Sequence, residues 1–192
     1  MGFLSTFRRS RVSAVLSGQG VSLRFPEMDD FHDWVHLRVQ SRSFLEPWEP
    51  TWPDDEFSQS AFRYRIRRYR DMREDDLCYP YFIFSGDTLV GAVTLSNVRR
   101  GVAQAGTLGY WIGEPHVRRG YMLKALSLLV PHCFSALGLH RVEAACLPRN
   151  EASIGLLEKA GFEREGYARS YLQIAGKWED HLLYAKVSPV PA

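Results

Sequence analysis

Apolar and polar positions along the chain follow two different periods, and the period separates strands from helices. Short apolar or alternating runs bounded by turn residues predict seven strands. These strands are residues 21–25, 81–85, 89–98, 105–113 and 141–147, and two final strands that divide residues 163–187 around a turn at Gly176. Apolar residues spaced three and four apart predict helices at residues 28–40, 57–74, 122–137 and 150–162.

The order of these elements predicts how the sheet is connected. A Gly-Asp turn between residues 81–85 and 89–98 is typical of an antiparallel hairpin. A helix separates the strands at 105–113 and 141–147, so these two are expected to pair in parallel, with space for a ligand at their carboxyl ends. We therefore expect an α/β, or α+β, fold with one mixed sheet and helices on its faces.

Prolines mark one helix and one loop. Pro131 falls inside the helix at 122–137, on the side away from its apolar face, where a kink is tolerated. Residues 45–55 hold three prolines and two tryptophans. Because proline interrupts helices and central strands, this segment is predicted to be an ordered loop with exposed aromatic side chains.

Length, charge and cysteine content indicate a single globular domain of the cytoplasm. The 192 residues fit one domain at 19–188, with an N-terminal extension at 1–18 and a tail at 189–192. No apolar run approaches the ~20 residues of a membrane span, and no secretory signal is apparent. The three cysteines are odd in number and far apart, which argues against a disulfide framework. The net charge of +2 does not by itself indicate a nucleic-acid partner.

A short basic stretch precedes the helix at 122–137. Arg118 and Arg119 supply positive charge, and Gly120 lets the backbone approach a ligand closely. A helix N-terminus adds unpaired N–H groups, so the stretch is either a pyrophosphate site or a surface turn with solvated arginines. A Walker loop and a Rossmann fingerprint are both excluded, because neither glycine pattern is present.

A second candidate element is Asn-Glu-Ala-Ser at 150–153. Asn150 is a good N-cap for the helix that follows, and Ser153 lies in its first turn. Both residues therefore fit either a purely structural role or a contact with a ligand.

Five sequence blocks occur in a fixed order between residues 20 and 187. They are FLEPWEP (44–50), LGYWIG (108–113), RGYMLKAL (119–126), NEASIGLLEKAGFEREGYA (150–168) and GKWEDH (176–181). In this order they resemble the GNAT N-acetyltransferases and, more narrowly, the RimJ-type ribosomal-protein-alanine N-acetyltransferases of bacteria. The resemblance implies the GNAT fold: a mixed, mostly antiparallel, twisted sheet of about six to seven strands with helices on both faces.

Two positions depart from the broad superfamily pattern Gln/Arg-x-x-Gly-x-Gly/Ala. Val117 stands at its first position and Met122 at its last. The change at Val117 matters little if backbone amides bind the ligand. The Gly-x-Met variant is similar to the RimJ type, so Met122 favours that branch of the family.

The resemblance implies acetyl-CoA as the cofactor and direct transfer of its acetyl group to an amine. Pantetheine would pair with the strand near Trp111, Ile112 and Gly113. The resemblance assigns the pyrophosphate to the loop and helix start at Val117, Arg118, Arg119, Gly120, Tyr121 and Met122. Asn150 would contact the pantetheine arm and Ser153 would protonate the leaving thiolate, while a strand N–H would hold the oxyanion.

The favoured acceptor is the N-terminal alanine or serine amine of a ribosomal protein, and a protein of the small subunit is the candidate that the resemblance suggests. At pH 7 about 10% of an N-terminal amine is neutral, against about 0.04% of a lysine, a difference of ~3 kcal/mol. An N-terminal amine therefore asks little of a general base. Two alternatives stay open: a small-molecule amine such as an antibiotic or polyamine, and a non-catalytic ribosome-assembly or RNA-binding factor on the same fold. The presence of both Asn150 and Ser153 speaks against the second.

Two carboxylates are candidates for the base. Glu49 in the proline-rich loop would bind the incoming ammonium or accept its proton, and Glu114 follows the central strand. The alternative for each residue is that it is an ordinary solvated carboxylate with no role in catalysis. The predicted acceptor slot comprises Trp48, Glu49, Tyr110, Tyr171 and Asp180, although aromatic residues at such positions are more often part of a core. His181, next to Asp180 near the final strand, is expected to shape the same slot.

A histidine pair and an arginine-rich helix are two further patterns with a possible function. His32 and His36 share one helix face, but a metalloprotease needs glutamate where Asp33 stands and a third ligand, so no metal site is expected. Six arginines between Arg63 and Arg73 form either the solvated face of a helix or a weak contact with ribosomal RNA. The sequence fits a monomer or a homodimer equally.

Overall fold

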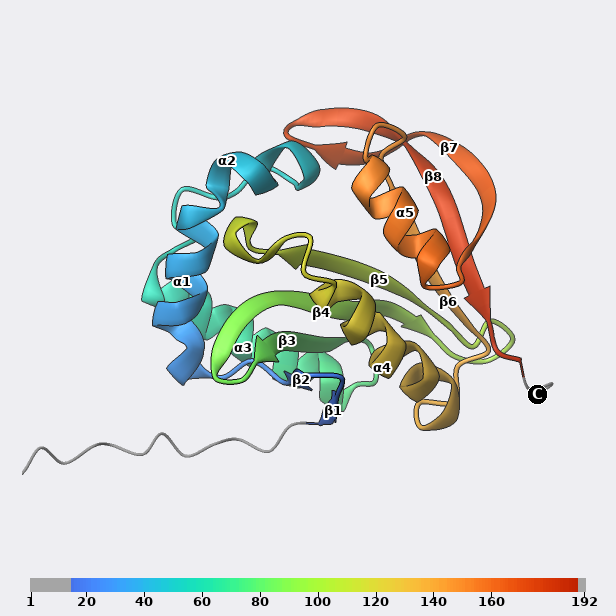
Figure 1. Ribbon diagram of the computed structural model, residues 1–192, viewed down its shortest axis with the longest axis horizontal. Helices are drawn as coiled ribbons and strands as arrows, with labels where there is room; N and C mark the ends of the chain where they lie inside the picture. Colours follow the sequence, from blue (N-terminus) through green and yellow to red (C-terminus); the bar gives the residue numbers. More distant parts are fainter. Residues whose placement is uncertain (1–14, 190–192) are drawn as a thin grey trace, which may run out of the picture.

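The computed structural model describes residues 15–189, which form one mixed eight-stranded sheet with helices on both faces (Figure 1). The strands are β1 (Leu16–Gly18), β2 (Val21–Arg24), β3 (Tyr79–Ser85), β4 (Thr88–Arg99), β5 (Ala105–Ile112), β6 (Arg141–Cys146), β7 (Glu163–Ile174) and β8 (Lys177–Val187). The helices are α1 (Phe31–Gln40), α2 (Arg42–Leu45), α3 (Gln59–Glu74), α4 (Tyr121–Ser135) and α5 (Glu151–Lys159). Short 3-10 turns are η1 (Met28–Asp30), η2 (Glu46–Trp48) and η3 (Glu114–His116).

The sheet order is β1-β2-β3-β4-β5-β6-β8-β7, and β5 with β6 is its parallel pair. The helix α4 makes the crossover between those two strands, as the sequence predicted. Every other neighbouring pair is antiparallel. The sheet has one strand more than expected, because residues 16–18, which we assigned to an N-terminal extension, form β1 and pair with β2. The remainder of that extension, residues 1–14, lies outside the described part of the chain.

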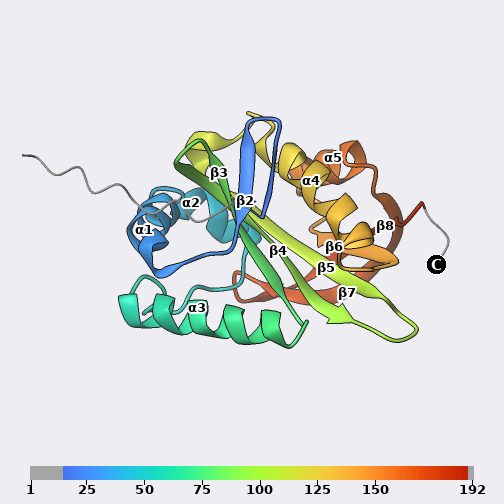
Figure 2. The same cartoon turned by 90° about the horizontal axis from the view of Figure 1, so that it is seen from below.

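Two apolar cores hold the helices against the sheet. The larger lies under α4 and α5 and includes Leu126, Leu129 and Leu157. The smaller lies under α1 and α3 and is built around Trp34 and Phe62. Figure 2 shows α3 along one face of the strands, with α4 and α5 on the other.

The proline segments differ from each other in outcome. Pro131 lies inside α4 on its exposed side, as predicted, so the apolar face of the helix stays continuous. The segment expected to be a loop at 45–55 begins instead with the end of α2 and the turn η2. Pro47 fits there because the first positions of a helical turn need no N–H donor.

The two central parallel strands pair for only part of their length. The last matched residues are Leu108 of β5 and Ala144 of β6. Beyond them β5 continues along β4 to Ile112, whereas β6 continues along β8 to Cys146. Within the described chain, residues 109–112 therefore have no backbone partner on their β6 side. We call this opening the β5–β6 gap.

Candidate active site

A cavity of about 930 Å³ follows the β5–β6 gap. Its walls come from β5, the start of α4, α5, the α2–η2 segment and the β7–β8 hairpin. Twelve of the residues singled out from the sequence line it: Trp48, Glu49, Tyr110, Trp111, Ile112, Val117, Arg118, Gly120, Tyr121, Met122, Asn150 and Ser153. Five others do not line it: Gly113, Glu114, Arg119, Tyr171 and Asp180.

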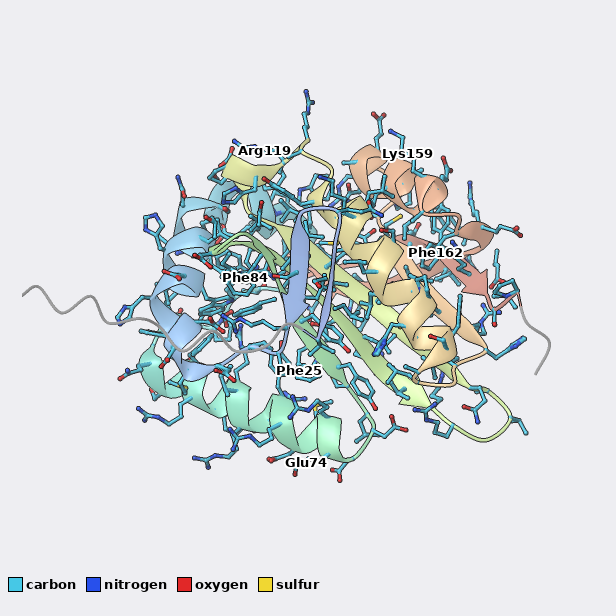
Figure 3. The ribbon with its side chains drawn as sticks, turned by 60° about the horizontal axis from the view of Figure 1, so that its bottom comes forward. Phe25, Glu74, Phe84, Arg119, Lys159 and Phe162 are labelled. Carbon is cyan, nitrogen blue, oxygen red and sulfur yellow. The ribbon has the colours of Figure 1, made fainter. Side chains whose placement is uncertain are left out.

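The loop before α4 has the backbone form of an anion site. Gly120 is the N-cap of α4 with a φ of 74°, in the left-handed region that favours glycine. It carries no side chain to cap the helix, so the first N–H groups of α4 stay available. Arg118 also has a positive φ, of 60°. Figure 3 shows the Arg119 side chain projecting away from the body of the molecule, and this residue does not line the cavity.

Asn150 and Ser153 lie at the other wall of the gap, at the start of α5. The Asn150 Oδ1 accepts a hydrogen bond from the Ser153 N–H at 3.0 Å, so this residue does cap the helix. Its amide nitrogen is not engaged by that bond and is free to serve a ligand. The Ser153 hydroxyl lies 2.6 Å from the Tyr110 hydroxyl. Burial raises the pKa of Tyr110, so this pair is a neutral one at physiological pH.

The opposite side of the cavity contains an ion pair that the sequence did not reveal. The Arg38 Nη1 and Nη2 donate to the two Glu49 carboxylate oxygens at 2.7 and 2.6 Å, and Trp52 Nε1 donates to the same carboxylate at 2.7 Å. The guanidinium lies over the rings of Trp52 at 4.2 Å and Trp111 at 5.0 Å. Arg38 is 5% exposed, and the Glu49 side chain is 19% exposed.

Glu114 and Asp180 occupy outer positions. Glu114 is exposed in η3, and its backbone N–H donates to the Ser41 hydroxyl at 2.9 Å. Asp180 accepts hydrogen bonds from the Tyr167 hydroxyl and the Ser170 N–H, and these bonds lower the pKa of its carboxyl. Neither carboxylate lines the cavity. Through its bonds to Tyr167 and Ser170, Asp180 orders the β7–β8 hairpin instead.

His181 of β8 was expected, together with Asp180, to shape the acceptor slot, but the sequence assigned it no catalytic role. It is 3% exposed and lines the cavity, and its ring meets that of Tyr171 edge-on at 5.7 Å. The exposed Tyr171 side chain therefore packs on the solvent side of His181 and does not line the cavity. No local sequence pattern predicts the burial of His181, because that burial depends on strands and loops far away in the chain.

Residues 15–189 contain neither a metal site nor a membrane-spanning helix. No group of three His, Cys, Asp or Glu side chains there is close enough to hold a metal ion. None of the helices in that range is long and apolar enough to cross a membrane.

The partly opened parallel pair, the uncapped helix start and the hydroxyl pair define the class of protein as a GNAT-fold acyltransferase. The family model described as acetyltransferase (GNAT) domain matches residues 21–163, so the chain belongs to this family.

Relatives and solved structures agree with that assignment. YjcK of Bacillus subtilis (strain 168), a probable N-acetyltransferase, is 37% identical over 177 residues, or 91% of this chain and 98% of its own. The [ribosomal protein uS5]-alanine N-acetyltransferase of Escherichia coli (strain K12) is 34% identical over 153 residues, or 79% of each chain. Mycobacterium smegmatis RimJ, in complex with CoA-disulfide, has a TM-score of 0.84 at 33% identity, over 88% of this chain and 82% of that one.

These comparisons confirm the predicted family, the fold, an N-acetyltransferase activity and acetyl-CoA as the cofactor. The chain's own geometry fits such a cofactor. The backbone of residues 109–112, which has no partner on its β6 side, matches an amide-bearing arm, and the start of α4 matches phosphate groups. A Cβ built on Gly120 would meet nothing within 4 Å, so the space beside this glycine is open for a ligand.

Proposed function

We propose that this protein acetylates the N-terminal alanine or serine amine of a ribosomal protein, most directly one of the small subunit. A relative of known specificity, the Escherichia coli enzyme, is named for the alanine of ribosomal protein uS5. Cytoplasmic location is part of the same proposal, and three free, buried cysteines suit a reducing compartment.

The observation that carries the proposal is the weakly acidic character of the acceptor side. Among the cavity-lining residues the carboxylates are Glu49 and Glu151. Glu49 is already neutralised by Arg38, and Glu151 is exposed at the start of α5. A polyamine carries several positive charges and would need several unpaired carboxylates. A single N-terminal amine does not, so this lining favours a peptide end.

The chain's own groups divide the work of acetyl transfer. Acetyl-CoA supplies an acetyl group activated as a thioester. The backbone of residues 109–112 would hold its pantetheine arm, with help from the Asn150 amide, and the amides of residues 118–122 would hold its pyrophosphate. The Ser153 hydroxyl would donate a proton to the leaving sulfur, with the neutral Tyr110 hydroxyl fixing its orientation.

Thiol release from acetyl-CoA tests the acceptor directly. We expect turnover with a peptide that begins with alanine or serine, and a mass shift on its first residue. The matched control is the same peptide with a blocked N-terminus and a free internal lysine. A panel of polyamines and aminoglycosides tests the alternative. Turnover of these amines, with none of either peptide, would contradict the proposed acceptor.

A second proposal concerns α3, where a contact with ribosomal RNA is consistent with the surface. Arg65 pairs with Glu56 and lies over Trp34, and Arg73 lies over Phe25, so these two are structural. The exposed basic residues of the helix are Arg63, Arg67, Arg68 and Arg70. Filter binding at low salt should detect RNA, with a steep loss on added salt. Unchanged binding after charge reversal of three of these four would rule the contact out.

A further inference from the structure

We propose that His181 is a catalytic residue that accepts the proton released by the acceptor amine. The inference rests on the acetyl-transfer activity and holds for whichever amine is the acceptor. Its basis is the position of one buried histidine and the direction of its two ring nitrogens.

The hydrogen bond of one ring nitrogen fixes the state of the other. The His181 Nδ1 lies 2.9 Å from the carbonyl oxygen of Glu179. A carbonyl oxygen only accepts, so Nδ1 must carry the proton. In the neutral ring the lone pair is then on Nε2, which is the arrangement that a proton acceptor requires.

The Nε2 atom is free and accessible. Among residues 15–189 it has no hydrogen-bond partner, and the one fully buried, unpartnered side-chain nitrogen or oxygen in that range is the Nε of Arg38. His181 is otherwise almost completely buried and lines the cavity. The remaining accessible surface of its ring therefore faces the cavity.

Strand alternation places His181 on the acceptor side of the sheet. Its neighbours Leu182 and Tyr184 belong to the core under α4 and α5. Successive side chains of a strand point to opposite faces, so His181 points toward the face that carries α1 and α2. Leu182 pairs with Cys146, the last residue of β6, which puts His181 at the mouth of the β5–β6 gap.

The two predicted carboxylate bases are less suited to this role. The Glu49 carboxylate accepts three hydrogen bonds, from Arg38 and Trp52, so most of its lone pairs are directed at these partners instead of at an acceptor amine. Glu114 is exposed and outside the cavity lining. Glu49 is better explained as a positioning residue that orders Arg38 and the tryptophans beside the acceptor.

The charged and titratable groups around His181 come from four segments. Asp180 adjoins it on β8, and Glu179 pairs with Arg149 at 3.1 Å. Tyr171 of β7 touches its ring, and Glu49 of the facing segment lines the same cavity. Asp180 is already engaged by Tyr167 and Ser170, and Glu179 by Arg149. The cavity-facing nitrogen of His181 is therefore not bonded to a fixed carboxylate.

Proton balance requires one acceptor and one donor. When the amine nitrogen bonds to the acetyl carbon and the carbon–sulfur bond breaks, the nitrogen loses one proton and the sulfur gains one. His181 Nε2 takes the first, directly or through one water, and Ser153 gives the second. Both side chains later exchange protons with solvent, so no further reactant is needed. The acid and the base approach the gap from opposite faces of the sheet.

The test compares the same substitution at two different histidines. His181→Asn keeps a short N–H donor for the Glu179 carbonyl and removes Nε2. His140→Asn, at an exposed histidine outside the cavity, is the control. Steady-state rates are measured from pH 6 to 9 with acetyl-CoA and an alanine-initiated peptide. If the wild-type protein acetylates only a small amine, that amine replaces the peptide in the assay. The proposed N-terminal acceptor is then wrong, but the proposed role of His181 is still tested.

We expect His181→Asn to lower kcat/KM for the amine about 100-fold or more at pH 7. The acidic limb of the wild-type pH profile combines protonation of the amine with protonation of the base, so the limb should become shallower in the variant and keep only the part due to the amine. The KM for acetyl-CoA should stay within about threefold of the wild-type value, as should all values for the control. A folded His181→Asn protein with kcat/KM within threefold of wild type and an unchanged acidic limb would overturn the proposal.

A measurement on the wild-type protein covers the case in which the variant does not fold. Nitrogen NMR of histidine-labelled protein identifies the neutral tautomer of each ring. We expect His181 to carry its proton on Nδ1 at pH 8. A proton on Nε2 in that state would leave no lone pair facing the cavity and would overturn the assignment.

Discussion

The donor half and the acceptor half of the cavity are built in different ways. The donor half uses backbone groups of residues 109–112 and the start of α4, supported by one short helix at Asn150. The acceptor half uses side chains, chief among them the Arg38–Glu49 ion pair and His181. The donor site comes from two local stretches, residues 109–122 and 150–153, whereas the acceptor site assembles residues from α1, η2, β5 and β8.

This difference teaches where each half is vulnerable. A site made of backbone tolerates many side-chain changes, so substitutions there should act locally on cofactor affinity or on one proton transfer. A site made of a buried ion pair couples binding to folding, because the loss of one partner leaves the other charged and buried.

The acceptor half is also tied to the rest of the fold through its backbone. In Figure 1 the tip of the β7–β8 hairpin meets the segment after α2, where the Ala175 N–H donates to the Glu49 carbonyl at 2.9 Å.

The largest effect is expected at Ser153 in the donor half. Ser153→Ala removes the proposed proton donor, so kcat should fall about 100-fold or more. The KM for acetyl-CoA should change little, because the backbone groups remain. Tyr110→Phe is the matched variant: it removes only the hydroxyl 2.6 Å away and should cost less than Ser153→Ala. Thiol-release kinetics measure both, and an unaltered kcat in Ser153→Ala would exclude the donor role.

Glu49→Gln should combine a loss of activity with a loss of stability. The substitution leaves the Arg38 guanidinium buried without its counter-charge, and removing one partner of a buried pair typically costs about 3 kcal/mol or more of unfolding free energy. Urea unfolding measures the change.

The double variant Arg38→Met, Glu49→Met separates the two effects. It should recover much of the stability, since an apolar pair of similar volume replaces the buried charges, but not the kcat/KM for the peptide. If Glu49→Gln keeps full kcat/KM from pH 6 to 9 and full stability, the ion pair has neither role.

Two glycines sharpen the contrast between the halves. Gly120→Ala forces a side chain into the left-handed region, at about 1–2 kcal/mol, and fills space at the phosphate position, so the KM for acetyl-CoA should rise. Gly109→Val places its side chain on the same face as Trp111, where a Cβ meets no protein atom within 4 Å. It should raise the KM for the peptide instead. The same KM rising in both variants would contradict the division.

The smallest effect concerns the three buried thiols. Burial raises the pKa of Cys78 to about 11, that of Cys133 to about 12, and also that of Cys146. The folded protein should therefore react slowly with a thiol reagent at pH 8, and all three should react once it is unfolded. Above pH ~8.5 the unfolded chain releases thiol protons that the folded chain retains, so the free energy of unfolding should fall as pH rises. Fast labelling of native protein would contradict the burial.

The sequence predicted the donor half better than the acceptor half for a physical reason. Strand, basic loop and helix start are local patterns, and Gly120, Asn150 and Ser153 occupy the cavity wall as expected. The parallel pair of β5 and β6 also followed from element order. Its partial opening did not, because strand separation depends on how β4 and β8 pair on either side.

The acceptor half depends on distances that no local pattern encodes. Nothing in the local pattern of the predicted helix at 28–40 marks Arg38, and its burial against Trp52 and Trp111 appears only when α1, the segment after η2 and β5 come together. His181 stood in a matching sequence block, yet its accessible nitrogen is set by strand direction on β8. Glu114 had the right position in sequence but η3 turns it outward.

A crystal structure with CoA and an alanine-initiated peptide tests the central claim most directly. We predict phosphates at the amides of residues 118–122 and pantetheine along residues 109–112. The peptide amine should lie on the face of the sheet that carries α1 and α2. There the amine should lie within about 2.6–3.2 Å of His181 Nε2 or be joined to it by one water. A peptide that enters from the α4–α5 side, or an amine held away from both His181 and the β5–β6 gap, would contradict the account.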